Sequence, residues 1–295
     1  MSSERRPPGD NPYRGPSGPR PDKRARERAR AAAAATPATV GHSVSEPVER
    51  SAPREQRVYG LNACLALFAA RPQDLRKLWL LESRLTALKP VVAWCVKQRI
   101  GYTVVGDEDL QKLSGSSHHE GVVMAAVPRA ELSLSNWLRD LPPGPQLAIW
   151  LDGVGNPHNL GAILRSAAHF GVAAVLLPKG GELAQSGAAL RVAEGGGEAV
   201  PLVRLGRSDN ALAQLVSAGF ALAATVVRDG DSLYAKPLPS RLVLVMGAEQ
   251  SGVSDELAQH APLRLGIPGS GAVESLNVAA ATAVFVGEWR RQHPG

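Results

Sequence analysis

Cysteine is scarce in this chain, which holds only Cys64 and Cys95 among its 295 residues. Both lie among apolar residues at helix-like spacing, so we expect two buried thiols rather than a disulfide or a pair of metal ligands. The adjacent His118 and His119 lack the spacing of zinc ligands, and no metal site is predicted. A reducing cytoplasm is therefore the expected compartment.

Long hydrophobic runs are also missing. No apolar stretch approaches the roughly 20 residues that a membrane helix needs, and the N-terminus lacks the hydrophobic region of a secretory signal. We therefore expect no membrane partner. The chain contains no P-loop, its glycine-rich DGVGNPHNLG does not fit a dinucleotide fingerprint, and no G-x-S-x-G elbow occurs.

Positive charge is present, but it is concentrated at one end. Residues 1–57 hold 12 Lys and Arg against 7 Asp and Glu, so they carry nearly all of the net charge of +6. They also hold 9 of the 23 prolines and almost no large apolar residue. Such a segment cannot bury enough surface to fold, so we predict a disordered basic tail. It is either a plain linker or an arm that contacts RNA.

The remainder divides into two predicted α/β units with a connection between them. Residues 58–127 show strand-like runs and an amphipathic helical pattern at 85–99, which indicates a small domain. Residues 128–145 read as a short helix and a proline-broken linker. Residues 146–295 form the larger unit.

Within 146–295, strand-like and helix-like segments alternate. The strand-like runs are almost wholly apolar and cover 147–152, 172–178, 199–204, 220–227, 242–247 and 263–268. Helical patterns at 158–170, 186–194, 209–218 and 277–291 separate most of them. This pattern predicts an α/β fold with a parallel sheet covered on both faces. The run Gly195–Gly197 predicts an unusually flexible stretch.

Three blocks in this region place polar side chains where strands end. The first is LDGVGNPHNLGAILRSAAHFGV at 151–172, a strand, a turn and a helix capped by Asn156 or Asn159. Arg165 lies roughly 140° from Leu160 around that helix, because each residue turns about 100°. It therefore leaves the apolar stripe, and alone it would be typical of a solvated helix arginine.

The second and third blocks follow two later strand-like runs. GAE at 247–249 offers a glycine that permits close backbone approach to a ligand and a glutamate that could cap the next helix. The third block is IPG at 267–269, a loop, and SLN at 275–277, where Ser275 is a candidate N-cap. Polar turns at the ends of parallel strands are where open α/β sheets bind ligands.

In this order the blocks resemble the motifs of the SpoU (TrmH-type) RNA methyltransferases of the SPOUT superfamily. The resemblance covers about 58–291, because VYGLNACLAL through HHEGVV is similar to the substrate-binding domain that precedes many members. It implies transfer of the methyl group of S-adenosyl-L-methionine to a ribose 2′-hydroxyl of RNA. It also implies a trefoil-knotted catalytic domain, a homodimer and no requirement for metal.

The resemblance also supplies the candidate site residues. The catalytic candidates are Asn159, Arg165, Glu249, Ser275 and Asn277. The candidates for binding the cofactor are Met246, Gly247, Glu249, Ile267, Pro268, Ser275 and Leu276. A protonated arginine has only donors, so we expect Arg165 to orient the hydroxyl and stabilise the developing oxyanion. A role as base would need a strongly perturbed guanidinium.

Two other functions stay open. A non-catalytic RNA-binding or ribosome-assembly protein would keep the fold without turnover, although the intact motif residues argue against it. A methyltransferase acting on a base nitrogen is the weaker alternative, because knotted relatives of that kind usually lack this motif set. Ribosomal RNA is favoured over tRNA as the substrate, since an appended RNA-binding domain is commoner in members that modify ribosomal RNA.

Overall fold

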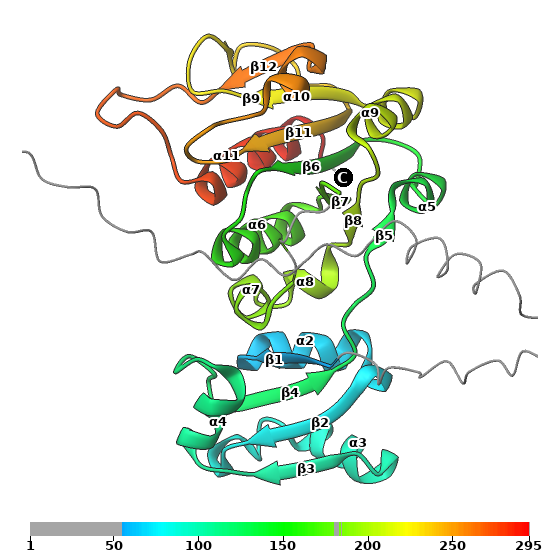
Figure 1. Ribbon diagram of the computed structural model, residues 1–295, viewed down its shortest axis with the longest axis vertical. Coiled ribbons are helices and arrows are strands. Elements are labelled where there is room, and N and C mark those ends of the chain that lie inside the picture. Colours follow the sequence, from blue (N-terminus) through cyan, green and yellow to red (C-terminus); the bar gives the residue numbers. More distant parts are fainter. Residues whose placement is uncertain (1–54, 180–182, 184, 295) are drawn as a thin grey trace, which may run out of the picture. The chain divides into compact units, whose positions relative to one another are not determined.

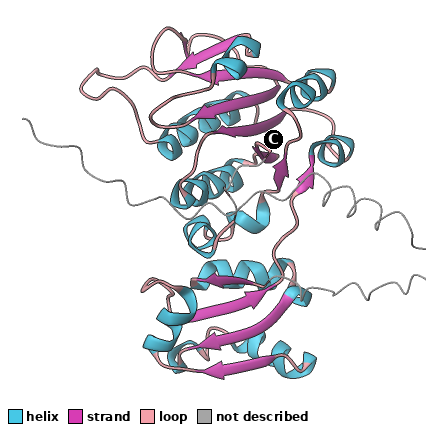
Figure 2. Cartoon of the chain, viewed as in Figure 1, coloured by secondary structure: helices cyan, strands magenta, loops and turns pink. Residues whose placement is uncertain are grey.

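The computed structural model describes residues 55–179, 183 and 185–294, which form two β-sheets with helices packed on them (Figures 1 and 2). The predicted basic tail lies outside these residues as far as Arg54. Among the helices described, none has the length and apolar character needed to cross a membrane.

The smaller sheet has four strands in the order β1-β4-β2-β3. Strand β4 pairs antiparallel with β1 and β2, whereas β2 and β3 are parallel. Leu78 and Leu80 pack in a core with α2 and α3, while Trp79 points to the opposite face and packs with α4. The elements are β1 (Gln56–Tyr59), α2 (Leu61–Ala70), β2 (Leu75–Leu80), α3 (Lys89–Gln98), β3 (Gly101–Val104), α4 (Asp107–Ser114) and β4 (Val122–Ala126).

The helix predicted at 85–99 is shorter in the structure. It begins at Lys89, and Pro90 occupies its first turn, where a missing backbone N–H costs nothing. The residues before it include a 3₁₀ turn at Glu82–Arg84. The apolar spacing alone could not separate this turn from the helix.

The larger sheet has eight strands in the order β10-β12-β9-β11-β6-β7-β8-β5, and each neighbouring pair is parallel. Its strands are β5 (Leu132–Ser133), β6 (Gln146–Asp152), β7 (Ala174–Leu177), β8 (Leu202–Arg204), β9 (Ala221–Thr225), β10 (Asp231–Ser232), β11 (Arg241–Gly247) and β12 (Leu263–Gly266). Its helices are α5 (Leu134–Arg139), α6 (Pro157–Phe170), α7 (Gly187–Ala193), α8 (Gly196–Ala199), α9 (Ser208–Ser217), α10 (Asp255–His260) and α11 (Val278–Gln292).

This sheet is buried on both faces, because β6 sends alternate side chains into two cores. Leu147, Ile149 and Leu151 lie in a core with α6 and α11. Ala148 and Trp150 lie in a second core with α5, α9 and α10. The strands are therefore apolar at nearly every position, and the predicted parallel α/β fold is confirmed.

The segment 128–145, predicted as a short helix and linker, also contributes to the sheet. Strand β5 extends the edge by pairing with β8, and α5 buries Leu134 and Trp137 in the second core. Both residues of β5 are exposed, so no apolar alternation marks this strand in the sequence.

The strand predicted at 199–204 starts only at Leu202, because α8 precedes it. The glycines predicted to make this region flexible instead permit close packing. A Cβ on Gly196 would lie 2.5 Å from the backbone oxygen of Leu164 in α6, and one on Gly197 would collide with the Leu190 side chain.

Candidate active site

Three chain segments meet at the carboxyl edge of the larger sheet. The last residues of β6 and β11, Asp152 and Gly247, are register partners on neighbouring parallel strands. The chain leaving β12 reaches the same edge and runs into α11 at Asn277. Ligands bind at this edge in open α/β sheets, so the three sequence blocks converge where a site is expected.

At this edge Asn159, Glu249 and Asn277 form one hydrogen-bonded set, which we call the Asn–Glu–Asn cluster. Asn159 Nδ2 donates to Glu249 Oε1 over 3.1 Å, and Asn277 Nδ2 donates to the same oxygen over 2.8 Å. Asn277 Nδ2 also lies 3.2 Å from Asn159 Oδ1. Two amides thus orient the carboxylate, while Glu249 and Asn277 stay exposed.

A helix cap places one of these side chains, Asn277, and the cap of α6 lies three residues before another, Asn159. Asn277 caps α11 by accepting a hydrogen bond from Ala279 N over 2.9 Å. Asn156 caps α6 by accepting one from His158 N over 2.9 Å. The cap of α6 is therefore Asn156, which leaves Asn159 free to face Glu249, and Ser275 is not the cap of α11.

The other residues predicted to bind the cofactor differ in how far they are exposed at this edge. The side chain of Met246 is buried in the sheet core, so only its backbone can face a ligand. Ile267 is half-buried and Pro268 is exposed at the end of β12. Ser275 is exposed, and Leu276 is 47% exposed, immediately before the cap of α11.

The surrounding backbone leaves no room for a side chain at Gly247. A Cβ at this position would collide with backbone atoms of Gly252 and Val253. The loop from Ala248 to Gly252 closes through two backbone hydrogen bonds of 3.1 and 2.8 Å, and Asp152 Oδ2 accepts a further one from the backbone N of Ser254 over 2.7 Å. Glycine at 247 therefore lets the loop that carries Glu249 fold back on the strand.

Arg165 lies apart from the cluster. Its Nη1 is 3.6 Å from Glu194 Oε1, and 62% of its side chain is exposed. Within the described ranges, no hydrogen bond or ion pair joins Arg165 to the Asn–Glu–Asn cluster. Glu194 also accepts a hydrogen bond from Asn62 Nδ2 of α2 over 2.7 Å. The sequence did not predict Glu194 or Asn62, because their contact joins positions 132 residues apart.

Helices α7 and α8 connect α6 to the smaller sheet and α2 (Figure 1). Arg71 makes two 2.9 Å contacts with the carboxylate of buried Glu198 and a 3.2 Å contact with Asp74. Burial acts to lower the pKa of Arg71, but Glu198 and Asp74 outweigh it and raise that pKa. Arg129 Nη1 donates to Gly197 O over 2.7 Å, and burial lowers the pKa of its guanidinium.

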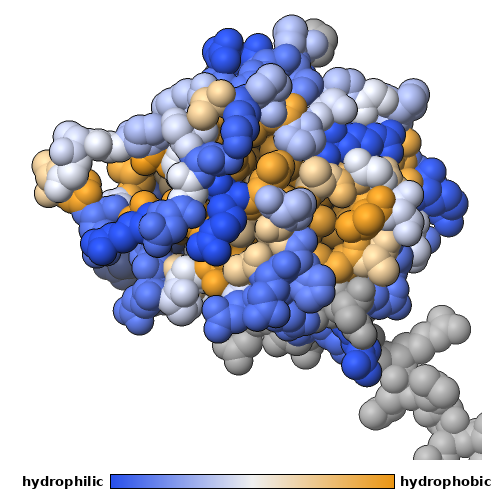
Figure 3. All heavy atoms as spheres, turned by 90° about the horizontal axis from the view of Figure 1, so that it is seen from above, coloured by the Kyte–Doolittle hydropathy of each residue, from blue (hydrophilic) through white to orange (hydrophobic). Residues whose placement is uncertain are grey.

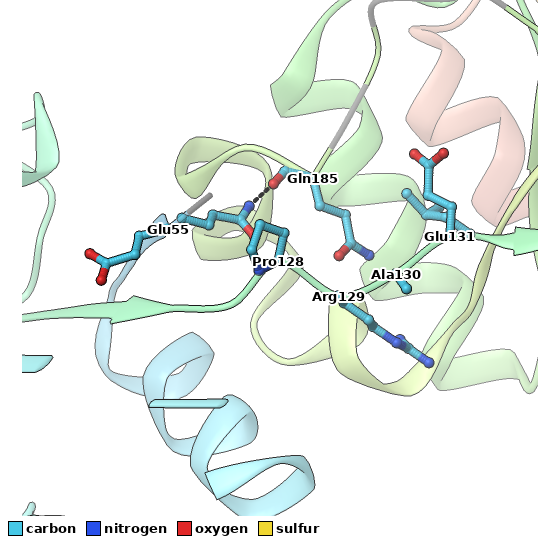
Figure 4. A pocket seen from close by; sticks show the side chains of 8 residues that line it. Glu55, Pro128, Arg129, Ala130, Glu131 and Gln185 are labelled. Carbon is cyan, nitrogen blue, oxygen red and sulfur yellow. Dashed lines mark hydrogen bonds between the residues drawn. The ribbon is translucent and has the colours of Figure 1, made fainter. Parts of the chain in front are cut away.

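A cavity of about 560 Å³ lies beside Arg129, near the contact of α7 and α8 with the smaller domain (Figure 4). Of its two acidic residues, Glu131 is paired with Arg204 at 2.6 Å. None of its lining residues belongs to the three motif blocks, so it is separate from the Asn–Glu–Asn cluster. It is lined by Glu55, Gln56, Pro128, Arg129, Ala130, Glu131, Gln185 and Leu202.

The described residues contain no group of three or more His, Cys, Asp or Glu side chains placed to hold a metal ion. Cys64 and Cys95 are both buried and free, which confirms the prediction of two buried thiols. Burial raises the pKa of each thiol above its ordinary value, so both stay protonated and unreactive.

Two protein families match this chain. The SpoU rRNA Methylase family matches residues 146–287, which include all three motif blocks. The RNA 2′-O ribose methyltransferase substrate binding family matches residues 57–132, which include the smaller sheet.

Individual relatives agree with these matches. The chain is 38% identical over 249 residues to an uncharacterized tRNA/rRNA methyltransferase, YfiF, of Escherichia coli O157:H7, covering 84% of this chain and 71% of that protein. It is 35% identical to the 23S rRNA (guanosine-2′-O-)-methyltransferase RlmB of Pseudomonas aeruginosa, covering 80% of this chain and 96% of the relative.

Solved structures agree in fold. The AdoMet-bound rRNA methyltransferase from Sinorhizobium meliloti has a TM-score of 0.68 and 25% identity, covering 82% of this chain and 89% of that one. A putative RNA methyltransferase of the TrmH family from Porphyromonas gingivalis has a TM-score of 0.63 and 29% identity, covering 81% and 90%. Asn159, Glu249 and Asn277 of the motif blocks meet at one sheet edge, and this chain belongs to the SpoU family of RNA methyltransferases.

Proposed function

We propose that this protein transfers the methyl group of S-adenosyl-L-methionine to a ribose 2′-hydroxyl of RNA. The observation that carries the proposal is the convergence of three separate motif blocks in the Asn–Glu–Asn cluster. Family membership supports the reaction and the cofactor. The P. aeruginosa relative is itself a guanosine-2′-O-methyltransferase, and the S. meliloti structure is AdoMet-bound.

The reaction requires the 2′-oxygen to be aligned with the methyl group and to lose its proton. In our proposal, the carboxylate of Glu249 and the amides of Asn159 and Asn277 hold the ribose by hydrogen bonds. The hydroxyl of Ser275 lies two residues before Asn277 and adds a further polar contact. Arg165 supplies a positive charge that stabilises the developing oxyanion.

The residues at this edge also suit the cofactor. Half-buried Ile267 and exposed Leu276 offer apolar surface for a purine ring, and Met246, Gly247 and Pro268 contribute backbone at the strand ends. When bound, the cofactor supplies an electrophilic methyl group on a sulfonium. The protein's task is then to orient the acceptor hydroxyl and to remove water from around it.

We propose ribosomal RNA as the substrate in preference to tRNA. The smaller domain matches a substrate-binding family of RNA 2′-O methyltransferases, and the P. aeruginosa relative modifies 23S rRNA. The two buried thiols suit an enzyme of the reducing cytoplasm, where its RNA substrate would be found.

We propose further that two copies form a symmetric dimer and that each catalytic domain is trefoil-knotted. In one copy the candidate site is open, because Glu249, Ser275 and Asn277 are exposed. Apolar side chains are also exposed in chain segments after the strand ends, notably Val273 at 71% and Tyr234 at 57%. Figure 3 shows apolar surface among hydrophilic groups on the face seen from above. A partner that covered this edge would exclude water from the site. Light scattering should then give about 62 kDa, twice the 31.0 kDa of one chain.

Calorimetric titration with S-adenosyl-L-methionine separates an enzyme from a binding protein that has kept only the fold. We expect saturable binding of one cofactor per chain. Mapping 2′-O-methyl groups in total RNA from cells with and without the protein then identifies the nucleotide. A chain that binds no cofactor and leaves every 2′-O-methyl group unchanged would favour the non-catalytic alternative.

A further inference from the structure

Glu194 has a backbone conformation that its residue type does not favour. It follows α7 with φ 50° and ψ 41°, in the left-handed region. Glycine or asparagine usually occupies this position at a helix end, because a Cβ is crowded there. A glutamate at such a position suggests that its side chain is kept for the contacts it makes.

The carboxylate of Glu194 has a different partner on each oxygen. Oε2 accepts a hydrogen bond from Asn62 Nδ2 over 2.7 Å. Oε1 lies 3.6 Å from Nη1 of Arg165, a catalytic candidate in the second half of α6. Asn62 belongs to α2 of the smaller domain, whereas Arg165 belongs to the methyltransferase domain. One side chain thus connects the two domains to a candidate catalytic residue.

The surroundings of Glu194 hold it in place. Helix α7 packs on α6 and on β1, and α8 packs on α6 and α2. Glu198, four residues after Glu194, forms a buried ion pair with Arg71 of the smaller domain, and this pair joins the same two domains. By contrast, the Arg165 side chain is largely exposed in its pair with Glu194, and exposed ion pairs hold a side chain only weakly. The hydrogen bond from Asn62 therefore supplies orientation that the ion pair alone would lack.

We propose that Glu194 is a positioning residue for Arg165, and that Asn62 of the smaller domain fixes the Glu194 carboxylate. This inference rests on the proposed methyl transfer. It gives the smaller domain a part in the catalytic step in addition to any part in binding RNA. Arginine has many rotamers, and a misplacement of about 1 Å can reduce a rate by as much as 100-fold.

The sharpest test is Glu194→Gly in the full-length chain, because glycine relieves the left-handed strain while it removes the carboxylate. We expect the melting temperature to stay the same or rise. We expect kcat to fall about tenfold, with KM for RNA and affinity for S-adenosyl-L-methionine within threefold of wild type. If Glu194 had only a structural role, kcat and the melting temperature would fall together. A lower kcat with an unchanged or higher melting temperature therefore indicates a positioning role.

A double-mutant cycle tests the link to the smaller domain. Asn62→Ala should lower kcat in the wild-type background and have no further effect in Glu194→Gly, because both act through one carboxylate. Glu131→Gln is the matched control: it removes a carboxylate paired with Arg204, away from Arg165, and should leave kcat unchanged. A kcat within twofold of wild type in Glu194→Gly would overturn the inference.

A chemical readout separates this inference from the proposed function. Phenylglyoxal reacts with accessible arginines, and mass spectrometry can follow the peptide that holds Arg165. We expect several-fold faster modification of Arg165 in Glu194→Gly, and in Glu194→Asn should the glycine variant fold poorly. Faster modification in a protein whose wild type methylates no RNA would count against the proposed function while supporting the contact. Unchanged modification would overturn the contact itself.

Discussion

Helix α6 carries two polar clusters that differ in how they are built. Near its start, Asn159 joins Glu249 and Asn277, and all three belong to the motif blocks of one domain. Six residues later, Arg165 meets Glu194 and, through it, Asn62 of the other domain. Those six residues advance roughly 9 Å along the helix and about 240° around it, so the two clusters occupy different faces.

This difference indicates how the proposed chemistry is divided. The Asn–Glu–Asn cluster is assembled by strand ends and helix caps, so folding of the larger sheet is enough to create it. The Arg165 cluster depends on packing between domains, and a single chain does not bring it to the first cluster. RNA bound between the domains, or a second copy of the chain, would have to bring the two clusters to one ribose.

The largest effect is expected at Arg165. Arg165→Ala should reduce methyl transfer to less than about a tenth of the wild-type rate, a barrier increase above ~1.4 kcal/mol, because the charge at the oxyanion is lost. Affinity for S-adenosyl-L-methionine, measured by calorimetry, should stay within a few-fold. Arg139→Ala is the control, since Arg139 is an exposed arginine at the end of α5, paired with Asp140. If the two variants were equally active, the Arg165 cluster would have no catalytic part.

The next effect is on stability at the domain junction. Arg71→Met would leave the Glu198 carboxylate buried without its partner and should cost about 3 kcal/mol in the free energy of unfolding. The double variant Arg71→Met/Glu198→Gln should recover most of this loss. Urea denaturation of the three proteins measures it. If Arg71→Met were as stable as wild type, the Arg71–Glu198 pair would not stabilise the contact between the two domains.

A smaller effect should separate capping from catalysis. Asn277→Asp keeps the oxygen that caps α11 but replaces the amide donor with an oxygen facing Glu249 Oε1. We expect kcat to fall roughly tenfold, with little change in melting temperature. Asn156→Asp makes the same change at the cap of α6 and should keep full activity. Equal losses in both variants would contradict a special role for the Asn–Glu–Asn cluster.

The smallest effect concerns Glu288, which lies far along α11 from Asn277. Hydrogen bonds from Arg291 and then Gln292 lower its pKa from 4.5 to about 2. Its folded-state pKa is depressed, so the stabilisation is complete above pH 4.5 and is lost as the pH falls towards 2. Arg291 is largely exposed, so the contribution should stay below about 1 kcal/mol. The free energies of unfolding of Glu288→Gln and wild type should differ less at pH 3 than at pH 6. A difference independent of pH would contradict the assignment.

The sequence predicted the elements whose signals are local. The ends of β6 and α6 were predicted correctly, because the apolar run of β6 stops at a glycine turn and the apolar stripe of α6 repeats at helical spacing. The fold class followed from strands apolar on both faces. Strand β10 and helix α8 are too short to show a period, so neither could be predicted.

The candidate site, too, was predicted in part and missed in part. Membership of the motif blocks singled out Asn159, Glu249 and Asn277, and the structure shows that they touch. The sequence could not show that Gly247 is required by Gly252 and Val253, because that collision depends on the path of a loop. The partner of Arg165 was also missed, since Glu194 reaches it only after α7 packs on α6.

The most direct test of the account is the identity of the methylated atom. The full-length protein should be incubated with tritium-labelled S-adenosyl-L-methionine and unmodified ribosomal RNA transcribed in vitro, and the RNA digested to nucleosides. We predict that the label appears in a 2′-O-methylnucleoside with the wild-type chain and is absent with Arg165→Ala. Label on a base, or no transfer by a chain that binds the cofactor, would contradict the account.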